Sequence, residues 1–345
     1  MDKFRITGGT PLHGELPVSG SKNAALPALA ACLLTEETVA LKRIPRVKDI
    51  ATMESLLAYA GARISNHNGS TCVQAKSLDR AEAPYDVVKT MRASSLVLGP
   101  LVARTGRARV SMPGGCAIGA RPINLHVSAL EQLGARIEQA HGYVEASAPD
   151  GLRGAHVHFD RITVTGTEDV LMAAVLARGE TVIRNAAREP EVKDLAELLI
   201  KMGAKIDGAG NSIVRIRGVE RLHGAEHTII PDRIEAGTFL LAGAISQGDV
   251  VVSGCEPEHV AALVVKMEQA GAEVDDLEPG VLRVRCARRP GAVDMTTEEY
   301  PGFATDLQAQ YMAWMSMARG ISFVTETIFE NRFMHTQELA RMGAN

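Results

Sequence analysis

The stretch "LLIKMGAKI", residues 198–206, decides the fold because similar sequences recur along the chain. Similar endings occur as "LLAYAGARI" (56–64), "LEQLGARI" (130–137), "VKMEQAGAEV" (265–274) and "ELARMGAN" (338–345). The five shared glycines are 73, 69, 68 and 72 residues apart: Gly61, Gly134, Gly203, Gly271 and Gly343. Self-similarity at a nearly fixed period indicates a repeated structural unit.

Each copy predicts a helix that ends at the shared glycine and a strand that begins after it. Glycine adopts the left-handed backbone that commonly terminates a helix. A turn and a second strand follow, as in "DGAGNSIVRIRG" (207–218). Because a strand follows Gly208 and Gly210, where a dinucleotide-binding loop requires a helix, this glycine pair is interpreted as a hairpin turn.

A more apolar helix and a strand precede each shared glycine. The predicted helices are "NAALPALAACLL" (23–34), "RASSLVLGPLVA" (92–103), "TEDVLMAAVLA" (167–177), "RIEAGTFLLAGAI" (233–245) and "DLQAQYMAWMSMA" (306–318). The predicted strands cover 38–44, 107–113, 181–187, 249–254 and 321–332. A helix that is apolar on nearly every face is buried. We therefore predict an inside-out α/β architecture, with these helices inside and the sheets outside.

The length of 345 residues exceeds one ordinary hydrophobic core, so two domains are expected. Five repeats do not divide evenly between two domains, and the fifth stops at Asn345, where its strand should begin. A sixth unit would give two sets of three in roughly 415–420 residues. The repeat thus predicts that the last structural segment lies beyond this chain.

Composition excludes several classes of protein. A net charge of −4 disfavours non-specific nucleic-acid binding. The longest apolar run, 24–34, contains a proline and is shorter than the ~18–20 residues that span a membrane, so no membrane partner is expected. The cysteines show no CxxC spacing and are interpreted as reduced thiols of a cytoplasmic protein. His156 and His158 could share a metal, but a solvent-facing strand is the favoured interpretation.

Polar residues gather where the apolar helices begin. Helix N-termini attract anions, although capping by Ser, Thr or Asp is the ordinary alternative. Lysine and arginine are poor partners for that end of a helix, so their recurrence favours a site for a multiply anionic substrate. The residues are Ser21, Lys22, Asn23, Lys89, Arg92, Thr165, Thr167, Glu168, Asp232, Arg233, Thr305 and Asp306.

One cysteine, Cys116, lies in the glycine-rich segment "PGGCAIGARP" (113–122). Neighbouring cations such as Arg92 and Arg121 would make its thiol acidic and reactive. A small apolar filler is the common role of a free cysteine. The residues alone leave both interpretations open.

Six motifs in order resemble the enolpyruvyl transferases, most nearly those that use UDP-N-acetylglucosamine. They are "SGSKNAALPALAA" (19–31), "TMRAS" (90–94), "PGGCAIGARP" (113–122), "PDRIEAGTF" (231–239), "TDLQAQ" (305–310) and "ETIFENRFMH" (326–335). The resemblance covers nearly the whole chain. It implies two inside-out α/β barrels of βαβαββ units, one formed by 22–230 and the other by 1–21 with 231–345.

The resemblance also implies a reaction. The enolpyruvyl group of phosphoenolpyruvate moves to the 3′-hydroxyl of UDP-N-acetylglucosamine through a tetrahedral ketal, and phosphate is released. This is the first committed step of peptidoglycan synthesis and the target of fosfomycin. It needs an acid, a base and cations around the anionic groups, but neither a metal nor a cofactor. The implied protein is cytoplasmic and a monomer or weak homo-oligomer.

Roles are implied for individual residues. Lys22 and Asn23 match the phosphoenolpyruvate-binding pair, Cys116 the proton donor and Asp306 the base at the sugar hydroxyl. His126 either adds a polar contact or is structural. The remaining matched substrate-binding positions are Arg92, Arg121, Pro122, Ile123, Asn124, Leu125, Ile328 and Arg332.

Some features depart from the family pattern. Asn124 replaces the usual aspartate near the uridine, and "GFATD" (302–306) replaces the usual "AFPTD". Two further arginines of the family's site come from a segment after Asn345. An inactive fragment or binding-only paralogue is therefore one alternative. An enzyme acting on shikimate 3-phosphate is another, disfavoured because that enzyme lacks the 113–122 motif.

Overall fold

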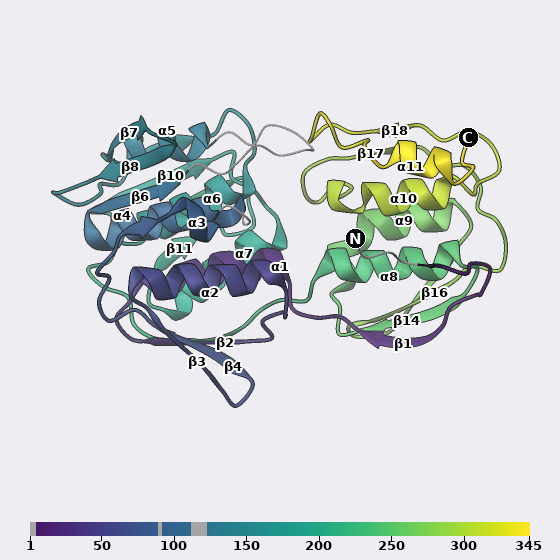
Figure 1. Ribbon diagram of the computed structural model, residues 1–345, viewed down its shortest axis with the longest axis horizontal. Helices are drawn as coiled ribbons and strands as arrows, with labels where there is room; N and C mark the ends of the chain where they lie inside the picture. The colour runs from purple at the N-terminus through teal and green to yellow at the C-terminus, as the bar shows by residue number, and fades with distance from the viewer. Residues whose placement is uncertain (1–4, 89–91, 112–122) are drawn as a thin grey trace. The chain divides into compact units, whose positions relative to one another are not determined.

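The computed structural model describes residues 5–88, 92–111 and 123–345, and its chain forms two compact units (Figure 1). The 20–230 unit contains the described residues from Gly20 to Ile230. The 231–345 unit contains the described residues up to Ser19 together with Pro231–Asn345. Each unit has a hydrophobic core of its own.

The 20–230 unit alternates helices and short strands. Its helices are α1 (Lys22–Ala31), η1 (Cys32–Leu34), α2 (Lys48–Ala60), α3 (Tyr85–Val88), η2 (Arg92–Val97), α4 (Leu98–Thr105), α5 (Asn124–Gln132), α6 (Val164–Ala174) and α7 (Pro190–Lys201). Its strands are β2 (Thr38–Lys42), β3 (Arg63–His67), β4 (Ser70–Gln74), β5 (Glu82–Ala83), β6 (Arg107–Ser111), β7 (Arg136–Ala140), β8 (Tyr143–Ser147), β9 (His156–His158), β10 (Glu180–Arg184), β11 (Lys205–Asp207), β12 (Ile213–Arg217) and β13 (Glu226–Thr228).

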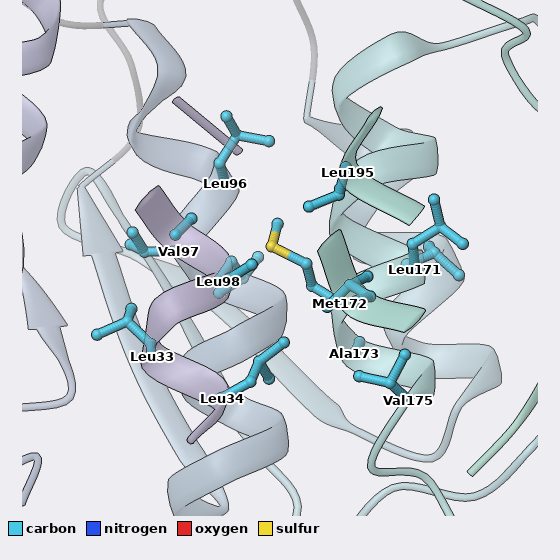
Figure 2. Packing of buried hydrophobic residues seen from close by; sticks show 14 of the residues in the cluster. Leu33, Leu34, Leu96, Val97, Leu98, Leu171, Met172, Ala173, Val175 and Leu195 are labelled. Atoms are coloured by element: carbon cyan, nitrogen blue, oxygen red, sulfur yellow. The ribbon is translucent and has the colours of Figure 1, made fainter. Parts of the chain in front are cut away.

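The apolar helices form the interior of this unit. Figure 2 shows Leu34 of η1 and Leu98 of α4 pointing toward side chains of α6 and α7, with Met172 between them. Leu33, Leu98 and Leu195 are among the fully buried residues, and burying one leucine contributes ~1.5–3 kcal/mol. The three sheets lie outside these helices (Figure 1). The predicted inside-out α/β architecture is confirmed.

The four-stranded sheets of the described chain repeat one topology. Their orders are β13-β2-β4-β3, β5-β6-β8-β7, β9-β10-β12-β11 and, in the 231–345 unit, β1-β14-β16-β15. In each, the first pair is parallel and the other two pairs are antiparallel. The strand predicted at His156–His158 is confirmed as β9. The parallel edge strands β5 and β13 were not predicted, because two or three residues are too few to show a periodic pattern.

The 231–345 unit repeats the plan once and then varies it. Its elements are β1 (His13–Pro17), α8 (Arg233–Ile245), β14 (Asp249–Ser253), η3 (Pro257–Val260), α9 (Ala261–Gln269), β15 (Glu273–Glu278), β16 (Val281–Arg285), β17 (Met295–Thr296), η4 (Thr305–Leu307), α10 (Gln308–Met315), β18 (Val324–Thr325) and α11 (Thr336–Arg341). Helix α8 lies over its sheet, with α10 stacked beyond (Figure 1). The rings of Phe303, Tyr311 and Trp314 pack edge to face in the core.

The glycines behave as the repeat predicts. All five shared glycines have positive φ, from 92° at Gly134 to 117° at Gly61. Gly208 and Gly210 both have φ of 82° and lie in the turn between β11 and β12. The hairpin interpretation is therefore confirmed.

One predicted element is wrong. The expected strand over 321–332 shrinks to the two residues of β18, and a turn follows it. The Glu326 carboxylate accepts the backbone N–H groups of Ile328 (2.8 Å) and Phe329 (3.1 Å). Because a strand would need those groups for its own pairing, this side chain ends the strand.

Three further expectations concern the rest of the described chain. No helix in it is both long and apolar enough to cross a membrane. Its four cysteines are free: Cys32, Cys255 and Cys286 are buried and Cys72 is half-buried. His156 and His158 project from the exposed face of β9, and no group of three or more potential metal ligands occurs in the part described.

Candidate functional site

The first candidate group lies at the start of α1. Ser21 caps this helix by accepting the Ala24 N–H at 3.3 Å, and its own N–H donates to Ile230 O at 2.8 Å. The helix start is therefore tied to the end of the 20–230 unit. Lys22 Nζ lies 3.2 Å from a carboxylate oxygen of Asp49, in the first turn of α2. Asn23 is half-buried beside it.

Sequence reasoning missed Asp49 as the partner of Lys22. Both side chains are roughly 40% exposed, at 42% and 37%. An exposed ion pair adds only ~0–1 kcal/mol to stability. The role of this ion pair is therefore to orient the lysine ammonium rather than to stabilise the fold. An acid in the first turn of the next helix was the only available signal, and many helices carry one there.

Several predicted residues surround a part of the chain that is not described. Cys116, Arg121, Pro122 and Lys89 lie outside the described residues, and Arg92 is described only as the first residue of η2. Ile123 is the residue before α5, Asn124 is its exposed first residue, and Leu125 is half-buried.

His126 on α5 is buried within the 20–230 unit. Its Nδ1 lies 3.3 Å from Asp169 Oδ2 and its Nε2 lies 3.1 Å from Thr165 Oγ1. Asp169 Oδ1 also accepts the N–H of Gly99 at 2.7 Å. These bonds join α5, α6 and α4, so they give the imidazole the structural role that was one of its two predicted interpretations.

Two residues predicted at an open helix start are interior instead. Thr167 and Glu168 are at most 1% exposed, because α6 begins earlier, at Val164 with Thr163 as its cap. Burial, with the negative charges of Glu191, Glu189 and Asp169, raises the pKa of Glu168 well above its usual range. The prediction that these two residues face an anionic ligand is wrong.

Capping also explains Asp232 at the start of α8. Its Oδ1 accepts the N–H groups of Ile234 at 2.9 Å and Glu235 at 3.1 Å. The ordinary alternative to anion binding therefore describes the Asp232 side chain.

The second candidate group lies in the 231–345 unit and brings together two predicted residues 26 positions apart. Arg332 Nη2 donates to Asp306 Oδ1 at 2.5 Å, and Nη1 donates to Thr305 Oγ1 at 3.1 Å. The guanidinium carbon lies 5.4 Å from the centre of the Phe329 ring. Ile328 is half-buried in the turn beside it.

The chemistry available differs between the two groups. Lys22 and Asn23 provide a cation and an amide at a helix N-terminus, where anions bind. Asp306 provides a carboxylate whose Oδ1 is held by an arginine, and no described residue bonds its Oδ2. A carboxylate oxygen in that state can accept a proton from a hydroxyl.

Solved structures show which class of protein has this fold. An enolpyruvyl transferase of Streptomyces tendae, NikO, superposes with a TM-score of 0.85, covering 97% of this chain and 80% of that one at 24% identity. An EPSP synthase of Acinetobacter baumannii superposes with a TM-score of 0.73, covering 96% and 78% at 17% identity. The fold is that of the enolpyruvyl transferases.

Sequence comparison gives the family. The model of the EPSP synthase (3-phosphoshikimate 1-carboxyvinyltransferase) family matches residues 6–345. A UDP-N-acetylglucosamine 1-carboxyvinyltransferase of Solibacter usitatus is 69% identical over 345 residues, covering 100% of this chain and 82% of that protein. One of the same name from Acidobacterium capsulatum is 61% identical over 349 residues, covering 100% and 80%. The chain belongs to this family and is a transferase.

Proposed function

We propose that this protein transfers the enolpyruvyl group of phosphoenolpyruvate to the 3′-hydroxyl of UDP-N-acetylglucosamine, as the first committed step of peptidoglycan synthesis in the cytoplasm. The observation that carries the proposal is the 69% identity, over all 345 residues, to a relative named for this reaction. At 17% identity, the likeness to an EPSP synthase structure supports the fold alone.

The residues divide the chemistry between acid, base and anion binding. Asp306 accepts the proton of the sugar hydroxyl through Oδ2, while Arg332 holds Oδ1. Lys22 and Asn23 bind the anionic groups of phosphoenolpyruvate, with Asp49 directing the lysine. Cys116 donates the proton to the vinyl carbon. No metal or organic cofactor takes part in these steps.

The nucleotide-sugar occupies the remaining positions. Arg121, Pro122, Ile123, Asn124 and Leu125 hold the uridine end. Arg92 acts at the nucleotide-sugar and phosphate side, and Ile328 contacts the substrate. Asn124 is exposed at the start of α5. An amide there offers hydrogen bonds without the negative charge of an aspartate.

Phosphate release tests the proposal. The protein is incubated with phosphoenolpyruvate alone, with added UDP-N-acetylglucosamine, or with added shikimate 3-phosphate. Release that requires the UDP-sugar supports the proposal, whereas equal release with shikimate 3-phosphate contradicts it. UDP-sugar binding without any release favours the binding-only alternative.

Intact mass after incubation with fosfomycin tests the cysteine separately. We expect one adduct on the wild-type protein and none on Cys116→Ser. Cys72→Ser is the matched control, since Cys72 is half-buried and lies on β4. An adduct that survives in Cys116→Ser but disappears in Cys72→Ser would remove Cys116 from the mechanism.

A further inference from the structure

We propose that Glu326 is a positioning residue for this reaction, because one carboxylate fixes both supports of the Arg332 guanidinium and so aligns Asp306. The inference rests on the proposed function, which places Asp306 and Arg332 at the substrate. It concerns a residue between the matched site positions, on the turn that replaces the expected strand.

The Glu326 carboxylate accepts four hydrogen bonds within the 231–345 unit. Oε1 accepts from Thr297 Oγ1 at 2.9 Å and from the N–H groups of Ile328 (2.8 Å) and Phe329 (3.1 Å). Oε2 accepts from Thr305 Oγ1 at 2.8 Å. An ionised carboxylate only accepts, so all four groups donate to it, three of them sharing Oε1 and one bonding Oε2.

The direction of each bond is fixed by chemistry. Thr305 has one hydroxyl hydrogen, and the carboxylate can only accept it. The Thr305 oxygen must then accept from Arg332 Nη1, because a guanidinium only donates. The series therefore runs from Arg332 through Thr305 to Glu326, and the orientation of the threonine hydroxyl depends on the carboxylate.

The second support of Arg332 depends on the same side chain. The Phe329 ring lies 5.4 Å from the guanidinium carbon, and the Phe329 N–H donates to Glu326 Oε1. Cation–π contact and the threonine bond together hold the guanidinium in the orientation from which Nη2 reaches Asp306. Loss of the carboxylate releases both supports at once.

Thr297 anchors this arrangement to the core. Its side chain is fully buried, and its Oγ1 accepts the N–H of Thr327 at 2.9 Å while donating to Glu326. Its backbone N–H bonds Thr325 O at 2.9 Å, in line with the β17–β18 pairing. The carboxylate is thus positioned by a buried, hydrogen-bonded residue of the unit.

The experiment measures kcat and KM for phosphate release in Glu326→Ala, Glu326→Gln, Thr305→Val and the double variant that combines Glu326→Ala with Thr305→Val. We expect Glu326→Ala to lower kcat by about 10²-fold, a loss typical of small misplacements of catalytic groups, with a smaller change in KM. Glu326→Gln keeps one acceptor oxygen for the three donors at Oε1 but places an amide donor where Oε2 accepted the Thr305 hydroxyl, so it should recover only part of the loss. The double variant should lose no more than about threefold beyond the worse single variant, since both act through one series.

Asp294→Ala is the matched control. This exposed carboxylate lies beside β17 and accepts the Phe323 N–H at 2.7 Å, so it also ties two segments of the same small sheet. It makes no bond to Thr305 or Arg332 in the described structure. Its kcat and KM should stay within about twofold of wild type, as for a surface substitution outside the site.

Hydrogen exchange provides a readout that needs no activity. We expect the Ile328 and Phe329 amides to exchange at least about tenfold faster in Glu326→Ala than in wild type or Asp294→Ala. Two outcomes would overturn the positioning role if the wild type is active. One is a Glu326→Ala variant that keeps kcat within threefold of wild type, and the other is a double variant whose loss equals the sum of the two single losses. If the wild type shows no UDP-sugar-dependent phosphate release, the proposed function is refuted instead. In that case, unchanged amide exchange of Ile328 and Phe329 in Glu326→Ala would also overturn the assignment to Glu326. Should Glu326→Ala not fold, a Thr305→Val variant with full kcat overturns it.

Discussion

Substitution of Asp169 tests how the helix after the 112–122 segment is held. Its carboxylate is fully buried and bonds Gly99 N–H at 2.7 Å and His126 Nδ1 at 3.3 Å. Asp169→Ala leaves both partners buried without their acceptor, and each such group costs ~1–3 kcal/mol. We expect a total loss of about 2–6 kcal/mol, the sum for two such groups.

Asp169→Asn is the discriminating variant. Its side-chain oxygen keeps the bond to Gly99, while its amide group faces His126 and forces the imidazole to accept at Nδ1. The ring can do so by donating Nε2–H to Thr165 Oγ1, which lies 3.1 Å away. The expected loss is therefore only ~1 kcal/mol, about the value of one rearranged hydrogen bond.

Urea unfolding followed by far-UV circular dichroism measures these losses, because this signal includes the helices of the 20–230 unit. Fluorescence of Trp314, the only tryptophan of the chain, reports on the 231–345 unit in the same samples. Equal losses for the Ala and Asn variants, or a loss below about 1 kcal/mol for Asp169→Ala, would refute the reasoning that two buried donors depend on this carboxylate.

Three further outcomes follow from single contacts. The methyl group of a Gly243→Ala variant would lie 2.7 Å from Val284 Cγ1 beneath α8. Urea unfolding followed by Trp314 fluorescence should therefore show a loss of about 1–3 kcal/mol in the free energy of unfolding, and an unchanged unfolding midpoint would contradict this packing. Burial and the charge of Arg332 lower the pKa of His335 below its usual value of about 6.5. As the pH falls below ~6.5, the unfolded chain therefore takes up a proton on His335 before the folded chain does, which lowers the stability of the wild type. His335→Gln should lose less stability than wild type between about pH 7 and 5, and parallel curves of stability against pH would contradict this. Burial raises the pKa of the Cys32 thiol, so peptide mass mapping after a thiol reagent should find Cys72 labelled well before Cys32, and equal labelling rates would argue against the buried α1–η1 segment.

The repeat allowed most of the architecture to be predicted from sequence. A helix that stops at glycine and a hairpin that follows are local features, and Gly203 or Gly208 carries the information within a few residues. The edge strands β5 and β13 were missed because each is defined by pairing to a segment elsewhere in the sequence. β13, for example, lies parallel to β2, whose residues precede it by more than 180 positions. Such pairing has no local pattern to detect.

The candidate site was predictable to the extent that its residues belong to motifs. Asp306 and Arg332 were named from sequence, and the structure joins them. Glu326 stands in the same "ETIFENRFMH" stretch, but it was interpreted as part of a strand, in which alternate side chains would point to opposite faces. The prediction for Thr167 and Glu168 was wrong for a related reason. The helix starts three residues earlier than predicted, so positions expected at its exposed end lie in its buried interior.

The inside-out fold explains why each unit can prepare its own share of the chemistry. When the apolar helices are central, their N-termini emerge from a rigid core, and polar side chains placed there are held by neighbours of the same unit. Lys22 meets Asp49 between the first and second helices of the first repeat. Asp306, Thr305 and Arg332 meet within the last described repeat, around Glu326. Because neither arrangement requires the other unit, a substitution such as Glu326→Ala should disturb the base without altering the Lys22–Asp49 pair. Under the proposed function, binding of phosphoenolpyruvate at Lys22 and loss of the hydroxyl proton at Asp306 are therefore expected to be separable by mutation.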